Sequence, residues 1–288
     1  MTDSADQVPR YLYRYRSIST KYFRDELERV INNSSIWMSS AADQNDPFDT
    51  LPYYYDGKPI ENKKLLQKLY KKYPTKFITG SNMIEKARAL GVKKRRIKKY
   101  LGSSFEVVRR VSKFAVKSFK KNRGDIMFSC FSDRSDSILM WSHYSDNHSG
   151  ICLEFEVPDK PYPLECNGLI GRIQYKSERT AISDTEILHS IGWSSFHDRE
   201  IFDESIEKKV MEGIILQKSN DWSYEREWRI LHYSTKSGYF SIRPIKLSLV
   251  LLGVNVTEEN KKIICDICAG KVGVVQMKMS DNEFKILK

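Results

Sequence analysis

Two alternating segments, one near each end of the chain, limit the folds that this sequence can adopt. They are YLYRYR at residues 11–16 and WSYEREWRILHY at residues 222–233. Because successive side chains of a β-strand point to opposite faces of a sheet, a period of two predicts strands with one charged face. In the first segment the charged face carries Leu12, Arg14 and Arg16. In the second segment it carries Glu225, Glu227 and Arg229.

Other segments predict further strands and a smaller number of helices. The spacing of Phe23, Leu27 and Val30 predicts a helix from Ser19, with Ser19 or Thr20 as its cap. Strands dominate the two ends of the chain, helices dominate its middle, and no internal repeat is present. We therefore predict the α+β class, with a mixed or antiparallel sheet that is either intact or split. The remaining predicted strands are residues 36–38, 125–132, 150–157, 169–175, 247–253, 272–277 and 283–287, and the remaining helices are 135–144, 200–218 and 257–269.

Positive charge is concentrated in residues 61–123. This stretch holds 21 Lys and Arg residues against three acidic residues, whereas the rest of the chain holds 27 basic and 34 acidic residues. A local charge of +18 beside a remainder of −7 indicates a separate inserted surface. We predict one α+β domain formed by residues 1–60 and 124–288, and a basic helical insertion at 61–123.

The densest part of the insertion is KKRRIKK at residues 93–99. Its cations predict a binding surface for nucleic acid or another polyanion. The alternative is a solvated helical insertion, because no interleaved aromatic residues or nucleic-acid motif accompany the charge. The candidate nucleic-acid-binding residues are Lys93, Lys94, Arg95, Arg96, Lys98 and Lys99.

Cysteine usage and the lack of long apolar runs indicate a cytoplasmic protein without a membrane partner. The five cysteines are odd in number and scattered, which favours reduced thiols. No apolar run approaches the roughly twenty residues of a transmembrane helix, and the first ten residues contain no leader-like apolar stretch. No metal is expected, because His143 and His148 would lie about 140° apart on a helix and could not share one ion.

Four blocks of the sequence carry a family resemblance. In chain order they are YLYRYRSI, IWMSSAADQNDPFD, CFSDRSDSILMWSHYSDNHSGICLEF, and WSYEREWRIL followed by LSLVLLGVNV. Together they resemble the bacterial family catalogued as domain of unknown function 2971. The resemblance spans most of the chain in the expected order, apart from the basic insertion.

A more distant resemblance is to ADP-ribosyltransferase-like enzymes, which hold NAD in a split β-sheet. Those enzymes use an arginine or histidine on the first strand, a Ser, Thr or Tyr on a middle strand, and a glutamate on a later strand. The resemblance implies NAD as the ligand and assigns those types, in order, to the following residues: Arg14 or Arg16, then Ser129 or Ser132 and Tyr144, then Glu225 or Glu227.

The chemistry of NAD cleavage explains why these residue types are needed. Positive charge develops on the ribose as nicotinamide leaves, so a carboxylate, with Glu227 preferred over Glu225, stabilises the transition state. An arginine binds the pyrophosphate, and Trp141 or Tyr144 stacks on the nicotinamide ring. His143 is a candidate acid, base or substrate donor, although a structural, hydrogen-bonded histidine is the alternative.

The sequence thus leaves two functional hypotheses. The first is an ADP-ribosyltransferase-like enzyme or NAD-cleaving effector of toxin or phage-defence type. The second is a non-catalytic nucleic-acid-binding protein that uses the insertion. For the first hypothesis, we expect Arg14, Ser129 or Ser132, and Glu227 to meet in one pocket on one side of the sheet. Trp141 and Tyr144 should border that pocket, and Glu227 should form a half-exposed pair with Arg229 that contributes under about 1 kcal/mol.

Overall fold

The structure is a computed structural model that describes residues 7–56, 59–72, 113, 116, 117, 123–196, 204–234 and 236–288. The chain divides into two compact units. The first comprises residues 1–46, 124–177 and 218–288, and the second comprises residues 47–123 and 178–217. Relative to the predicted division, residues 47–60 and 178–217 thus group with the second unit. The predicted polyanion-binding residues 93–99 lie outside the described residues.

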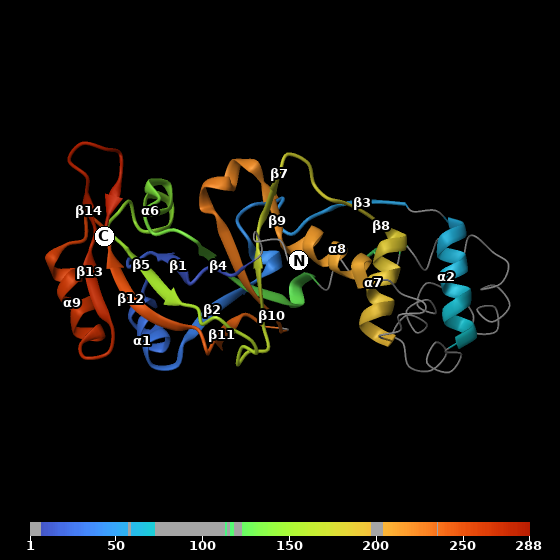
Figure 1. Cartoon of the computed structure of the whole chain (residues 1–288), viewed down its shortest axis with the longest axis horizontal. Helices are drawn as coiled ribbons and strands as arrows, with labels where there is room; N and C mark the ends of the chain where they lie inside the picture. The colour runs from blue at the N-terminus through green and yellow to red at the C-terminus, as the bar shows by residue number, and fades with distance from the viewer. Residues whose placement is uncertain are drawn as a thin grey trace. The chain divides into compact units, whose positions relative to one another are not determined.

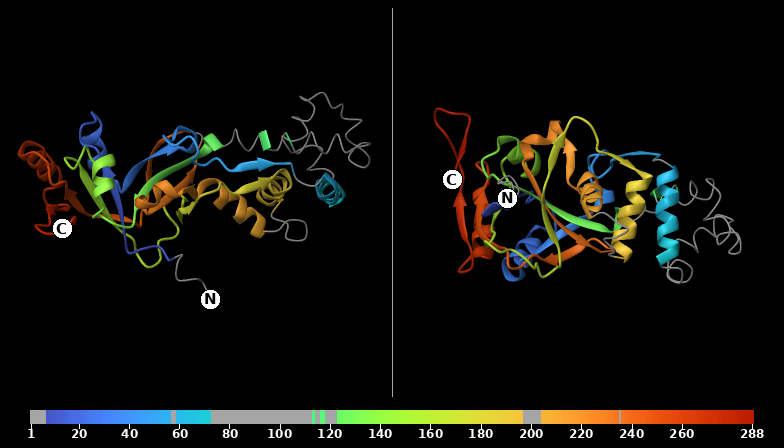
Figure 2. Two further views of the ribbon diagram at one scale, coloured as in Figure 1. Left: turned by 90° about the horizontal axis from the view of Figure 1, so that it is seen from above. Right: turned by 45° about the vertical axis from the view of Figure 1, so that its right-hand side comes forward.

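Helices make up most of the described second unit. Its α2 (Pro59–Lys72), α7 (Asp184–Phe196) and α8 (Glu204–Ile215) accompany a parallel pair of short strands, β3 (Tyr53–Tyr55) and β8 (Ala181–Ser183). Figure 2 shows α7 and α8, in yellow and orange, lying side by side. The Asn62 amide of α2 donates a 3.1 Å hydrogen bond to Asp184 at the start of α7. The part of the predicted basic insertion that the structure describes as α2 is therefore helical.

The first unit is built on one large sheet (Figure 1). Nine strands of the described residues join it, and every pairing is antiparallel except that of β12 with β13. This mixed sheet with helices confirms the α+β prediction. Its strands are β1 (Tyr11–Arg16), β2 (Ser35–Ser40), β4 (Ile126–Ser132), β5 (Ile151–Glu156), β6 (Leu169–Arg172), β10 (Glu227–Tyr233), β11 (Gly238–Ser241), β12 (Lys246–Leu252) and β13 (Gly273–Gln276). The other strands are β7 (Gln174–Lys176), β9 (Gln217–Ser219), β14 (Lys278–Met279) and β15 (Ile286–Leu287).

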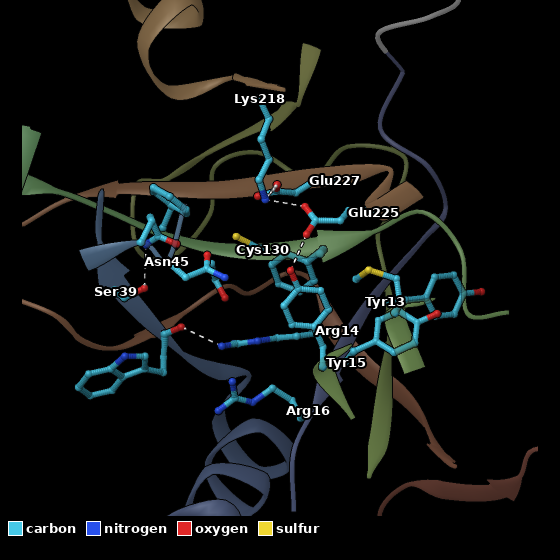
Figure 3. A pocket seen from close by; sticks show the side chains of 17 residues that line it. Tyr13, Arg14, Tyr15, Arg16, Ser39, Asn45, Cys130, Lys218, Glu225 and Glu227 are labelled. Carbon is cyan, nitrogen blue, oxygen red and sulfur yellow. Dashed lines mark hydrogen bonds and ion pairs between the residues drawn. The ribbon is translucent and has the colours of Figure 1, made fainter. Parts of the chain in front are cut away.

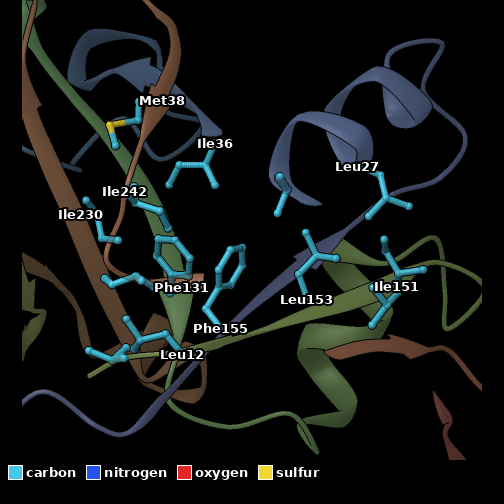
Figure 4. Close-up of a cluster of buried hydrophobic side chains, with 14 of the residues drawn as sticks. Leu12, Leu27, Ile36, Met38, Phe131, Ile151, Leu153, Phe155, Ile230 and Ile242 are labelled. Atoms are coloured by element: carbon cyan, nitrogen blue, oxygen red, sulfur yellow. The ribbon is translucent and has the colours of Figure 1, made fainter. Parts of the chain in front are cut away.

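Alternation along the strands sends apolar side chains to both faces of this sheet. On one face, Leu12, Phe131 and Phe155 pack with residues of α1 (Phe23–Asn33) and α9 (Glu258–Cys268), as Figure 4 shows for the centre of the cluster. On the other face, α6 (Ile138–Tyr144) buries Trp141 against Tyr15 with ring centroids 5.3 Å apart. Helices therefore cover both faces, and the sheet is the shared layer between them.

The helix predicted from Ser19 begins later, at Phe23. Ser19 does not cap it, because the backbone N–H and hydroxyl of Ser19 both donate to the carboxylate of Asp146 at 3.1 and 2.8 Å. Tyr22 occupies the N-cap position without a capping side-chain hydrogen bond. The apolar spacing placed the helix correctly, whereas the predicted cap Ser19 binds a residue more than a hundred positions away.

The second alternating segment is a strand only from Glu227 onward. Residues Asn220–Glu225 form a 3₁₀ helix, η4, and Arg226 follows it with a positive φ of 46°. A left-handed residue at this point breaks the period of two, so Glu225 does not lie on the strand face predicted for it. The carboxylates of Glu225 and Glu227 are nevertheless kept close by their shared contacts, described below.

The sheet parts along one edge of β4. The other edge of β4 pairs with β10 over its whole length. On the parting edge, β2 pairs with Phe128 and β1 pairs with Ser132. Among the described strands, residues 129–131 therefore have no partner on this edge, and β1 and β2 diverge from each other there.

Among the described residues, no helix combines the length and the apolar character needed to cross a membrane.

Phe155 tests the core of the first unit. It is fully buried on β5, in register with Leu12 and Leu247 on the neighbouring strands, and its ring meets that of Phe131 edge to face at 5.5 Å. We expect Phe155→Ala to lower the free energy of unfolding by about 3–5 kcal/mol, measured by urea denaturation. The matched control is Phe284→Ala, at a side chain that is 99% exposed, which should change it by less than about 0.5 kcal/mol. Equal losses in the two variants would contradict the assigned core.

Candidate functional site

A cavity of about 220 Å³ lies where the sheet parts. Residues of β1, β2 and β4 line it, together with side chains from α6, β9 and η4. Figure 3 shows Lys218, Glu225 and Glu227 on one side of the cavity and Arg14 and Arg16 on the other. The cavity thus contains two groups of charged side chains, which come from segments far apart in the sequence.

Arg14 connects the two strands that part. Its side chain is almost fully buried, and its Nη2 donates to the backbone carbonyl of Trp37 on β2 at 3.2 Å and lies 3.7 Å from the Glu26 carboxylate. Burial and the neighbouring Arg16 lower the pKa of Arg14 to about 10, although Glu26 opposes this shift. The guanidinium therefore stays charged at neutral pH. Its hydrogen bond to Trp37 links β1 to β2, which do not pair with each other through their backbones.

Three polar atoms at this side of the cavity are buried without a hydrogen-bond partner among the described residues. They are Nη1 of Arg14, Nε of Arg16 and the hydroxyl of Ser129. Arg16 does pair through its Nη2 with Glu26. A buried polar group without a partner is costly, and two of these atoms can only donate. The arrangement therefore favours an anionic or oxygen-rich ligand.

On the other side of the cavity, Lys218 lies between two carboxylates. Its Nζ donates to Glu225 at 2.6 Å and to Glu227 at 3.1 Å. Arg229 is fully buried, donates from Nε to Glu227 at 2.6 Å and lies with its guanidinium carbon 4.2 Å from the centre of the Phe128 ring. The predicted half-exposed pair of Glu227 with Arg229 is therefore wrong, because Glu227 is only 2% exposed and its charge is balanced by buried cations.

The two carboxylates differ in acidity. Burial opposes ionisation of Glu227, but Arg229 and Lys218 outweigh it and hold the pKa of this carboxyl well below its usual range, at about 2. Burial raises the pKa of Glu225, and the neighbouring Glu227 adds to the rise while Lys218 opposes it. The hydroxyl of Tyr144 donates to Glu225 at 2.6 Å. Glu227 is thus ionised at neutral pH, and Glu225 is the more basic carboxylate, a division that suits paired acid–base roles.

The predicted residues Arg14, Ser129 and Glu227 share this cavity, as do Arg16, Tyr144 and Glu225. They do not share a face of the sheet. Arg14 lies two residues after Leu12 on β1, so it points to the same face, which α1 covers. Glu227 lies opposite Ser132 in the register of β10 with β4, and both point to the other face. The expectation of one common face is therefore wrong. One cavity contacts both Arg14 and Glu227 because β1 and β2 separate at this place.

Three other candidates do not line the cavity. Ser132 is fully buried, and its hydroxyl accepts a hydrogen bond from the backbone N–H of Arg134. Trp141 is also fully buried, and its indole N–H donates to the carbonyl of Ser135 at 2.8 Å. His143 is exposed, with Nδ1 3.1 Å from the hydroxyl of Tyr224. Residue spacing in short strands and helices therefore did not predict which side chains line the cavity.

Several lining residues carried no recognisable sequence signal. Lys218 is a single lysine in a short strand, and Trp37 lies in a segment that was predicted only as a strand. Cys130 lines the cavity too, and it is exposed. No group of three or more His, Cys, Asp or Glu side chains in the described ranges is arranged to hold a metal ion.

Glu227 links stability to pH. A carboxyl whose pKa falls from 4.5 in the unfolded chain to about 2 in the folded protein contributes stability that is complete above pH 4.5 and lost as the pH falls toward 2. We expect the wild-type protein to lose about 2 kcal/mol more than Glu227→Gln between pH 5 and pH 3, measured by urea denaturation. At pH 7, Glu227→Gln should be less stable by about 3–5 kcal/mol, because two buried cations lose their partner.

The matched control for this test is Glu258→Gln. Glu258 lies on α9 with an 88% exposed side chain, so the variant should keep the pH dependence of the wild type. If Glu227→Gln also kept it, Glu227 would not be the low-pKa group.

The comparisons with known proteins concern one part of the chain. Residues 140–230 match the model of a family described as "Protein of unknown function (DUF2971)". No curated protein matches the chain. No solved structure matches it, so the resemblance to ADP-ribosyltransferases stays a prediction. The matched residues include Tyr144, Lys218, Glu225 and Glu227 of the cavity, and the match confirms the predicted resemblance to this family over residues 140–230.

Proposed function

We propose that this chain is an ADP-ribosyltransferase-like enzyme or NAD-cleaving effector that binds NAD at the cavity and breaks the bond between nicotinamide and ribose. One observation carries the proposal. Arg14, Arg16 and Ser129, which each have a buried polar atom without a partner among the described residues, line the same cavity as two carboxylates, one with a lowered pKa and one with a raised pKa. An effector that consumes cellular NAD would act as a toxin or phage-defence component. A cytoplasmic location, predicted from the scattered cysteines, would give it access to this substrate.

The carboxylates suit the charge changes of this reaction. As the C1′–N bond breaks, nicotinamide leaves as a neutral molecule with the bonding electron pair, and positive charge develops on the ribose. The Glu227 carboxylate remains ionised and can stabilise that charge. C1′ then bonds to the oxygen of water or of an acceptor, and Glu225, the more basic carboxylate, can take the released proton.

The donors on the other side of the cavity suit a pyrophosphate. Arginine binds phosphate oxygens through parallel N–H groups, and Nη1 of Arg14 and Nε of Arg16 are both unpartnered among the described residues. The hydroxyl of Ser129 adds a third contact beside them. Because Glu26 neutralises only one of the two guanidinium charges, an excess positive charge favours the anion.

Glu227→Gln tests the proposed chemistry. The amide keeps the size of the side chain but removes the charge that the transition state requires, so we expect nicotinamide release to fall by about 10² to 10³-fold. The dissociation constant for NAD should change only a few-fold, since the pyrophosphate contacts remain. Nicotinamide is measured by chromatography, and the folded fraction by circular dichroism at the assay temperature.

Two further variants complete this test. Glu225→Gln keeps Glu227 ionised and should slow nicotinamide release without unfolding the protein, while the exposed Glu258→Gln should match the wild type. Full turnover by folded Glu227→Gln would remove Glu227 from the mechanism. A wild-type protein without NAD turnover, with water or any acceptor tested, would reject the catalytic proposal.

A second candidate function is polyanion binding by the basic insertion. It is favoured by the charge of +18 over residues 61–123. In the described part of this stretch, α2 exposes Lys64, Lys68 and Lys71 along its length. The two candidates are compatible, because a transferase can modify nucleic acid.

Replacing Lys93, Lys94, Arg95 and Arg96 by Ala tests this second function. Removal of four phosphate-binding cations should lower the salt concentration at which the protein elutes from heparin and flatten the salt dependence of RNA or DNA binding. Stability should change little, since exposed charges contribute little to folding. The matched control replaces four exposed lysines of the first unit, Lys21, Lys262, Lys278 and Lys285. Equal losses in both variants would show that binding depends on overall charge and not on the insertion.

A further inference from the structure

The cavity is too small to enclose a dinucleotide. Its volume of about 220 Å³ is below the roughly 300–1,000 Å³ of sites that bury most of a drug-sized ligand. A ligand of the size of NAD would therefore extend beyond the cavity, onto the surface beside it.

Trp37 leads from the cavity to that surface. Trp37 lines the cavity, its carbonyl accepts the Arg14 hydrogen bond, and it is nevertheless 40% exposed. The residues on either side of it in β2, Ile36 and Met38, are fully buried in the core. A residue that lines the cavity thus keeps part of a large aromatic ring open to solvent.

Tyr239 and Arg29 support this ring. Tyr239 lies opposite Trp37 in the β2–β11 register, with ring centroids 5.2 Å apart at 74°. The guanidinium carbon of Arg29 lies 4.7 Å from the centre of the Tyr239 ring. Burial and the Glu26 carboxylate raise the pKa of Tyr239, consistent with a position close to the pair formed by Arg14 and Glu26. The aromatic pair therefore adjoins the side of the cavity that favours an anion.

We propose that Trp37, held by Tyr239 and Arg29, is a stacking platform for the purine base of a ligand whose phosphates lie against Arg14. Exposed aromatic rings beside arginine are the surfaces on which nucleic-acid-binding proteins stack bases. Trp37 also forms a cross-strand pair that stabilises the sheet, but such a pair does not require an open face at a cavity mouth. This inference rests on the proposed function for the other half of the ligand.

The platform gives the site a preference among nucleotides. ADP-ribose and NAD carry both a pyrophosphate and an adenine, and they should engage Arg14 and Trp37 together. Nicotinamide mononucleotide has no purine base, so its binding should not depend on Trp37. The substrate class is therefore a purine dinucleotide or its ADP-ribosyl part.

Isothermal titration of ADP-ribose and nicotinamide mononucleotide tests the platform. We expect Trp37→Ala to weaken ADP-ribose binding by about 10- to 100-fold, as for the loss of one stacked base, and to leave mononucleotide binding within about two-fold. Trp37→Phe keeps an aromatic face and should recover most of the affinity. The matched control is Tyr22→Ala, at a ring that is 60% exposed but does not line the cavity, and it should bind both ligands like the wild type.

Each outcome separates the platform from the catalytic proposal. Unchanged ADP-ribose binding by Trp37→Ala would overturn the platform, even if the protein cleaves NAD. Equal weakening of both ligands would also overturn it, because a structural role affects the whole cavity. Selective weakening of ADP-ribose in a protein that does not cleave NAD would support the platform and reject catalysis. Failure of the wild type to bind ADP-ribose would overturn the platform directly.

Discussion

The separation of β1 from β2 along β4 is the constraint on which the rest of the site depends. Two strands that part inside a sheet leave backbone groups without ladder partners and a space between them, and both are unfavourable unless something fills the gap. The guanidinium of Arg14 does so by reaching from β1 to the carbonyl of Trp37. Because it is charged and buried, it also requires Glu26 as a partner, which fixes the helix α1 against the parting.

The buried charges on the two sides of the cavity have different balances. On one side, Glu26 faces two guanidinium groups, which leaves a positive excess. On the other side, Lys218 and Arg229 face two carboxylates, and the balance is neutral while both are ionised. Burying such groups is expensive, and apolar residues of similar size would often be at least as stable. These buried charges are therefore the feature on which the proposed ligand binding rests.

The sequence predicts the strands better than it predicts the site. Period-two alternation places β1 and β10 because each needs one apolar face for the core. The left-handed Arg226 could not be foreseen, since nothing in its neighbours requires a positive φ. Residue chemistry pointed to Arg14 and Glu227, yet alternation gives only a face and contains no information about where a sheet parts. No sequence pattern pointed to Lys218, because its role comes from its contacts with Glu225 and Glu227 in the folded chain.

The parting of the sheet also means that part of the cavity wall is main chain. Among the described strands, residues 129–131 of β4 have no strand partner on that edge, so the peptide groups that point toward it make no ladder hydrogen bond there. Peptide donors and acceptors are the same for every amino acid except proline, which lacks the N–H, and other substitutions at these positions would leave them in place. A specificity built on them would persist through sequence drift, and two relatives with different side chains at this edge could still recognise the same molecule.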